Sequence, residues 1–135
     1  MDEILEFLLR HCSFLYKDLG CRFVDSQCSK SFGGDALLIL ASDKVRFRFV
    51  RDRGQLFADF QGPTAGTDDE WFSIDIVRKH LTGESEYHSE MNPENIAFLK
   101  ERFSEIEGLF QPSSLTATRK QLHKLEAERA KRLFG

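Results

Sequence analysis

Residues 35 to 60 contain three strand-like runs, at 35–41, 45–51 and 55–60, joined by connections of only a few residues. Such short connections allow antiparallel neighbours and exclude the long crossovers that parallel strands need. A further run at 21–27 also suits a strand. The sequence therefore predicts a four-stranded antiparallel meander.

Side-chain alternation predicts the register of this meander. A two-residue turn at 42–43 would place Leu38 opposite Phe47. In the middle run, large apolar and basic side chains alternate, so the phenylalanines share one face and the arginines the other: Phe47, Phe49, Arg46 and Arg48. The sheet should therefore have one core face and one mixed face, which is either half covered by a helix or a contact surface.

The second turn allows two registers. A three-residue turn ending at Gly54 would place Asp59 opposite Phe47, inside the core, whereas a two-residue turn at 53–54 places Asp59 opposite Arg48. Because an unpaired buried carboxylate costs more than a less favoured turn, we predict the two-residue turn.

Helical periodicity predicts helices on both sides of the meander, at 3–17, 68–81, 93 to about 110 and 113–133. Asn92-Pro93 is a clear helix start, and the acids at 68–70 are also interpreted as one. The predicted fold class is α+β, with an N-terminal helix, the four-stranded antiparallel meander and three helices packed on the sheet. We expect a single domain over 1–135 with a C-terminal helix over 113–133.

Charge is segregated along the chain, although the formal net charge is only −3. Residues 44–53 carry five basic residues and one acidic residue, and residues 112–135 carry six basic and two acidic residues. Residues 68–107 carry eleven acidic and four basic residues. We expect the last two helices to form an antiparallel hairpin, which would neutralise part of this acidic segment from within the chain.

The acidic segment is the predicted partner-binding site. Its acids cluster around an expected loop and two helix starts, and aromatic side chains of the kind that anchor protein interfaces lie among them. The predicted partner-binding residues are Asp68, Asp69, Glu70, Trp71, Asp75, Glu84, Glu86 and Tyr87. The alternative is a solvated helix face whose acids match the helix dipoles.

No sequence pattern here is typical of catalysis. The four histidines are scattered, and HExxH, GxSxG, GxGxxG and P-loop motifs do not occur. Cys12, Cys21 and Cys28 form no CxxC pair, so we expect free, buried thiols and no zinc knuckle. We therefore expect a protein that is not an enzyme, with no catalytic residue, no metal site and no cofactor.

Two features of the sequence bear on location. It contains no apolar run long enough to cross a bilayer, and its first residues, Met1-Asp2-Glu3, do not start a secretory signal. We therefore expect a cytoplasmic protein with no membrane partner.

The stretch FRFVRDRGQLFADF at 47–60, with WFSID downstream at 71–75, is similar to a pattern in the immunity proteins of bacterial polymorphic toxin systems, including contact-dependent growth inhibition. The resemblance implies a cytoplasmic inhibitor that binds a cognate toxin domain, often a nuclease, and blocks its active site. It implies no catalytic residues, no cofactor and no membrane partner.

The alternative function is a nucleic-acid-binding or regulatory scaffold domain that uses the basic strand 44–53 or the basic C-terminal helix. In the strand, rings and charges point to opposite faces, so they cannot act together on one nucleic acid. Arg48 also has an expected partner in Asp59. Nucleic acid is therefore the less favoured partner.

Overall fold

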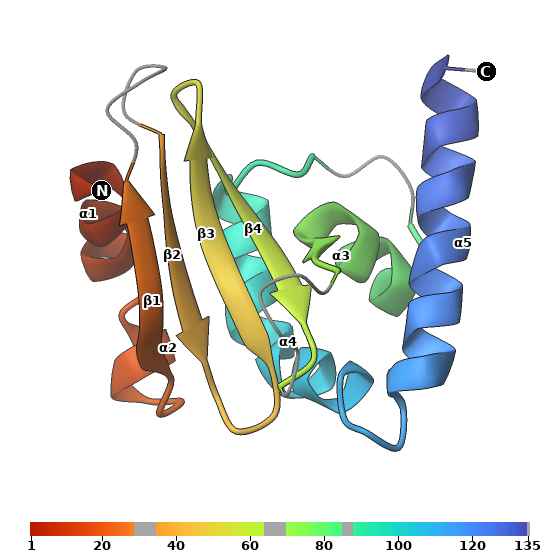
Figure 1. Ribbon diagram of the computed structural model, residues 1–135, viewed down its shortest axis with the longest axis horizontal. Coiled ribbons are helices and arrows are strands. Elements are labelled where there is room, and N and C mark those ends of the chain that lie inside the picture. Colours follow the sequence, from red (N-terminus) through yellow and green to blue (C-terminus); the bar gives the residue numbers. More distant parts are fainter. Residues whose placement is uncertain (29–34, 64–69, 85–87, 135) are drawn as a thin grey trace.

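Five antiparallel strands form one sheet in the order β1-β2-β3-β4-β5 (Figure 1). The computed structural model describes residues 1–28, 35–63, 70–84 and 88–134. The strands are β1 (Arg22–Cys28), β2 (Ala36–Ala41), β3 (Arg46–Asp52), β4 (Gln55–Gln61) and β5 (Phe72–Ser73). The α+β class is confirmed, and β5 is a short fifth strand that the sequence did not predict.

The first hairpin turn lies at 43–44, one residue later than predicted. Ser42 precedes it, and its hydroxyl accepts two backbone N–H groups of the turn at 3.2 Å each, which fixes this position. Leu38 consequently pairs with Phe49 and not with Phe47. The predicted pairing was wrong by two residues, but a slip of two leaves every side chain on its predicted face.

The second hairpin confirms the predicted two-residue turn. Arg53 and Gly54 form it with φ of +52° and +83°, and Arg48 pairs with Asp59 across the strands. Arg48 Nε donates to Asp59 Oδ2 at 2.8 Å. Two positive φ values in succession are typical of a type I′ turn, which matches the twist of the flanking strands.

This turn gives a stability prediction. Arg53→Asn should raise the free energy of unfolding by about 0.5 kcal/mol, because Asn tolerates a positive φ better than Arg does. Gly54→Ala should lower it by about 1 kcal/mol through the backbone alone, since an added Cβ meets no atom within 4 Å. Equilibrium urea denaturation measures both. Arg53→Lys is the control and should change little, and a destabilising Arg53→Asn would contradict the assignment.

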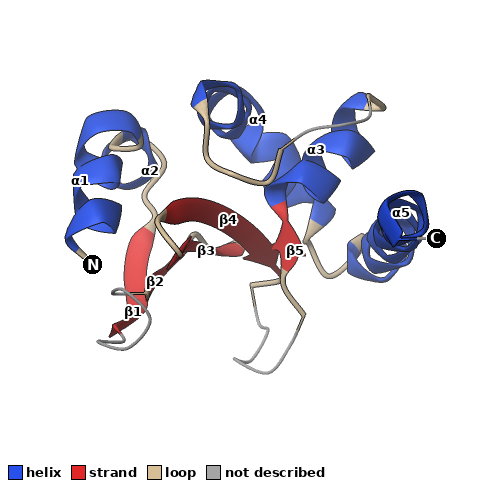
Figure 2. Cartoon of the chain, turned by 90° about the horizontal axis from the view of Figure 1, so that it is seen from above, coloured by secondary structure: helices blue, strands red, loops and turns tan. Residues whose placement is uncertain are grey.

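The helices lie on one side of the sheet, except for the last. They are α1 (Asp2–His11), α2 (Phe14–Lys17), α3 (Ile74–Thr82), α4 (Pro93–Leu109) and α5 (Leu115–Phe134). Figure 2 shows α1 to α4 above the same face of the sheet, with α5 standing beside α3. α5 packs mainly against α3 and not in the expected hairpin with α4, and it contacts the sheet at β5, where the His123 ring packs on Phe72.

Two helix starts differ from prediction and one is confirmed. The first predicted helix is divided at 12–13 into α1 and α2. The helix predicted to start at 68 begins instead at Ile74, because the residues before it pair with β4 as β5. The Asn92 side chain accepts the backbone N–H of Asn95 at 2.8 Å, which confirms it as the N-cap of α4.

The core between sheet and helices is built on phenylalanine. Phe47 is fully buried at its centre, with ring centroids of Phe49, Phe60 and Phe103 at 6.0, 6.2 and 5.7 Å. Phe110 is also fully buried. These five rings lie in the core, and Phe47 and Phe49 share the core face of the sheet as predicted.

The two edges of the sheet differ. The outer edge of β4 is covered by β5 and by an isolated bridge between Phe57 and Glu90. On the opposite side β1 is the edge strand: its seven residues are exposed, and its register shifts between Phe23 and Asp25. The second face of the sheet, opposite α1 to α4, is called the outer face below. None of the described helices is long and apolar enough to cross a membrane.

Candidate functional site

A groove of about 590 Å³ opens at the outer face of the sheet, beside the C-terminal part of α5. Strands β3 and β4, the start of α3 and the last turns of α5 contribute its walls. Its apolar side chains are Val50, Phe57, Ile76 and Leu133. Val50 and Phe57 share the outer face with Arg48 and Asp59, because residues two apart on a strand point to the same face.

One side of the groove is organised around Arg48. Its guanidinium is held by Asp59 at 2.8 Å and lies over the Trp71 ring, 4.5 Å from the ring centroid. Asp59 is 16% exposed and Arg48 28% exposed. Arg48 is therefore fixed from two sides in a partly desolvated place, where such contacts are stronger than in water.

The other side is organised around Asp75 in the first turn of α3. Arg129 of α5 donates to Asp75 Oδ2 at 2.6 Å and to Ser73 Oγ at 3.2 Å, and Ser73 donates to the second Asp75 oxygen. Asp75 is buried, with 8% of its surface exposed. Its charge is therefore paired within the chain, and its role as a partner-binding residue stays a prediction.

Further basic side chains border the groove. Lys79 of α3 and Arg132 of α5 line it together with Asp52 and His88. In the described part of the chain, no hydrogen bond or ion pair joins the His88 imidazole to a carboxylate. The groove thus presents charges of both signs around an apolar strip.

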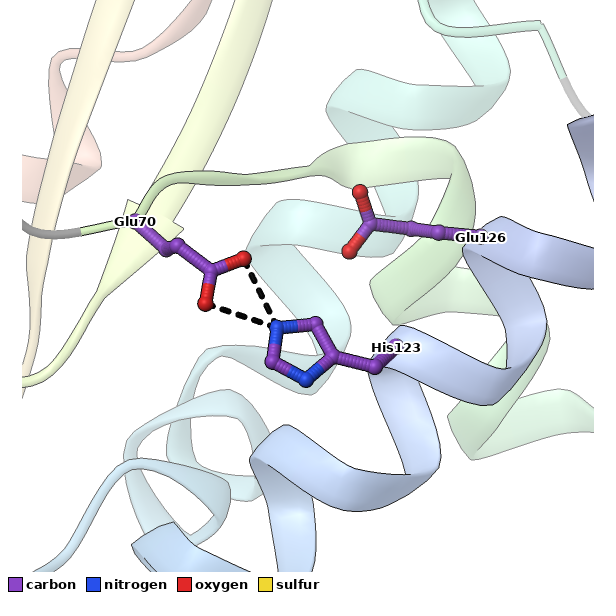
Figure 3. Close-up of side chains that lie close together, drawn as sticks. All are labelled: Glu70, His123 and Glu126. Carbon is purple, nitrogen blue, oxygen red and sulfur yellow. Dashed lines mark hydrogen bonds and ion pairs between the residues drawn. The ribbon is translucent and has the colours of Figure 1, made fainter.

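Glu70 belongs to a second cluster, which it forms with His123 and Glu126 of α5. His123 Nε2 lies 2.7 Å from both carboxylate oxygens of Glu70, and Glu126 follows one helical turn later (Figure 3). Burial raises the pKa of the Glu126 carboxyl above its ordinary value, and the Glu70 carboxylate raises it further, while His123 and Arg129 oppose this shift. Glu70 is thus not a free acid either.

The predicted acids that lie within the described residues are spread over the segment before β5 and both ends of α3. Asp75 lies in the first turn of α3, whereas Glu84 lies beyond the C-terminal end of this helix. The Trp71 ring lies against the Arg48 guanidinium. Asp68, Asp69, Glu86 and Tyr87 lie outside the described residues.

The sheet side of the groove was predicted from the sequence, whereas the side that α5 contributes was missed. The mixed sheet face was predicted as a possible contact surface, and alternation in β3 and β4 carried that signal. The contribution of α5 was missed because this highly charged helix has few apolar residues, and these do not determine which element it packs against. In the structure Leu122 is fully buried and Leu125 packs beside the core.

The three cysteines are free thiols, but only two are buried as predicted. Burial raises the pKa of both Cys12 and Cys21 to about 12, so these thiols stay protonated and unreactive at neutral pH. Cys28 is exposed on β1.

Comparisons of this chain with protein-family models, curated proteins and solved structures found no match.

Proposed function

We propose that this chain is a non-catalytic protein-binding domain whose partner docks in the groove at the outer face of the sheet. One observation carries the proposal. Helices α1 to α4 cover the core face, whereas the outer face has a groove that ends at Leu133, with 62% of that side chain exposed. Apolar side chains bordered by charged ones are typical of protein interaction sites.

The Arg48–Trp71 pair supplies a suitable anchor. Tryptophan and arginine carry much of the binding energy in protein interfaces. Arg48 is already held by Asp59 and by the Trp71 ring, so little side-chain entropy remains to be lost on docking. The carboxylates of Asp59 and Asp75 are each engaged by a guanidinium, which favours recognition over proton transfer as their role.

The specific partner that we propose is a cognate bacterial toxin domain, a nuclease in the first instance. The support is the position of the two segments that resemble immunity proteins. Segment 47–60 supplies Arg48, Val50 and Phe57 to the groove, and segment 71–75 supplies Trp71 beside it and Asp75 within it. Both segments thus meet at the outer face although they are separated along the chain.

Charge enters this proposal differently from the sequence-based expectation. Because Asp75 and Glu70 are paired within the chain, these two acids are not free to carry the contact. Charges of both signs in the groove instead favour a partner with a complementary mixed surface, since electrostatic complementarity governs specificity and association rate.

Leu133→Glu tests the docking surface. Co-expressed with a candidate nuclease toxin domain, the wild-type chain should restore growth, and the purified pair should bind with measurable Kd by calorimetry. Leu133→Glu should weaken Kd at least ten-fold, equivalent to about 1.4 kcal/mol, because it places a charge in the apolar part of the groove.

Leu9→Glu is the matched control. Leu9 is 70% exposed on α1, on the opposite side of the sheet, so this variant should bind like the wild type. Loss of binding in Leu9→Glu but not in Leu133→Glu would overturn the groove assignment, and no binding by the wild type would overturn the toxin assignment. Salt-sensitive binding of a DNA oligonucleotide by the wild type would instead favour the nucleic-acid alternative.

A further inference from the structure

Three metal-ligating side chains meet where α5 crosses the segment before β5. His123 and Glu126 are three residues apart on α5, so they share one helix face. Glu70 reaches the same place from the chain that leads into β5. One potential ligand atom from each of the three lies within 4.8 Å of the other two. Figure 3 shows the Glu126 carboxylate directed toward the Glu70–His123 pair.

This cluster has more acceptors than donors. Glu126 Oε1 is shielded from solvent and accepts no hydrogen bond within the described part of the chain. The one imidazole nitrogen that faces the carboxylates is shared between both oxygens of Glu70. A shielded oxygen without a partner costs free energy, and a cation placed between the three groups would remove that cost.

The donor set selects the kind of cation. Imidazole nitrogen suits zinc and other transition-metal ions, whereas calcium and magnesium prefer sites made of oxygen alone. Ligand atoms in such sites are about 3 Å apart, which small side-chain rotations achieve from the observed separations. His123 Nε2 is the nitrogen that faces both acids, and its ring packs on Phe72 with centroids 5.5 Å apart, which fixes its orientation.

We propose that Glu70, His123 and Glu126 form a binding site for a divalent transition-metal ion, with Zn²⁺ as the preferred ion. Each side chain supplies one ligand atom, and water completes the coordination. No metal site was expected from the sequence, because Glu70 is more than fifty residues from His123 and Glu126 along the chain. The ion would join the segment before β5 to α5, independently of the outer-face groove.

Zn²⁺ binding to the full-length chain tests the site. Isothermal titration calorimetry of the metal-depleted protein should give one Zn²⁺ per chain. Trp71 follows Glu70 directly and is the only tryptophan, so its fluorescence should respond to Zn²⁺ and be quenched by Co²⁺ at the same stoichiometry. An excess of Mg²⁺ should not displace Zn²⁺.

Glu126→Gln and His123→Gln are the diagnostic variants. Each removes one ligand and keeps the side-chain size, so each should weaken Zn²⁺ binding at least ten-fold and abolish the Zn²⁺-dependent rise in Tm. Glu128→Gln, two residues further along α5 and exposed, is the matched control and should bind like the wild type.

The exposed thiol of Cys28 is the main competing ligand, so each titration is repeated in a Cys28→Ser background. Unchanged binding in that background supports the site. Loss of binding on Cys28→Ser alone, equal binding by Glu126→Gln and wild type, or no binding by the wild type would each overturn it. The groove variant Leu133→Glu should keep full Zn²⁺ binding, which separates this site from the docking surface.

Discussion

Phe47→Ala should lower the free energy of unfolding by about 4 kcal/mol, the largest effect that we expect from a single substitution in this chain. Phe47 is fully buried at the centre of β3 and contacts rings from β3, β4 and α4. Truncation removes its apolar surface from the core and leaves a cavity that three large rings cannot fill without moving. Equilibrium urea denaturation, followed by far-UV circular dichroism, measures the change.

Phe23→Ala is the control for this prediction. Phe23 lies on the edge strand β1, 54% exposed, with one aromatic contact to Tyr16 at 5.9 Å. Its truncation should lower the free energy of unfolding by about 1 kcal/mol or less. Equal losses at the two positions would show that the core is not centred on Phe47.

Asp75→Ala should lower the free energy of unfolding by about 2 kcal/mol, because it leaves the Arg129 guanidinium without its carboxylate partner. This is less than the roughly 3–5 kcal/mol of a fully buried pair, since 32% of the Arg129 side chain is exposed to screening water. Arg129→Ala should give a loss of similar size, and the double variant should be less destabilised than the sum of the two. Denaturation of the four proteins as a double-mutant cycle measures this coupling.

The exposed pair between Arg22 and Asp43 is the control for this cycle. Its N–O distance is 3.2 Å, but the side chains are 62% and 95% exposed. Asp43→Ala should therefore change stability by about 0.5 kcal/mol at most. If the Asp75 cycle shows no coupling, Arg129 does not hold α5 to α3.

The strand register could be predicted from the sequence where one of two possible registers would have buried a charged side chain without a partner. The turn at 53–54 was predicted correctly because Asp59 had to be paired rather than buried, and only one register allowed it. At 42–43 no such conflict existed, and the Ser42 hydroxyl shifted the turn by one residue. The placement of Phe47 and Phe49 on the core face followed from alternation alone.

The missed features depend on contacts between distant segments. The acids at 68–70 have the local character of a helix start, but Phe72 pairs with Phe60 of β4 and delays the helix to Ile74. Likewise, Asp75 has the local character of an exposed dipole-matched acid until Arg129 contacts it from 54 residues away. Local sequence cannot report such pairs, so the candidate site was predicted only on its sheet side.

The two sheet edges also bear on self-association in concentrated solution. An exposed strand edge is a template for another chain, and aggregation by strand addition starts there. The backbone groups along the outer edge of β4 are covered at two places, by β5 and by the bridge to Glu90. On β1 the register shift near Val24 interrupts the row of backbone groups, and Arg22 and Asp25 place charges along it. The fold thus protects one edge by occupancy and the other by irregularity.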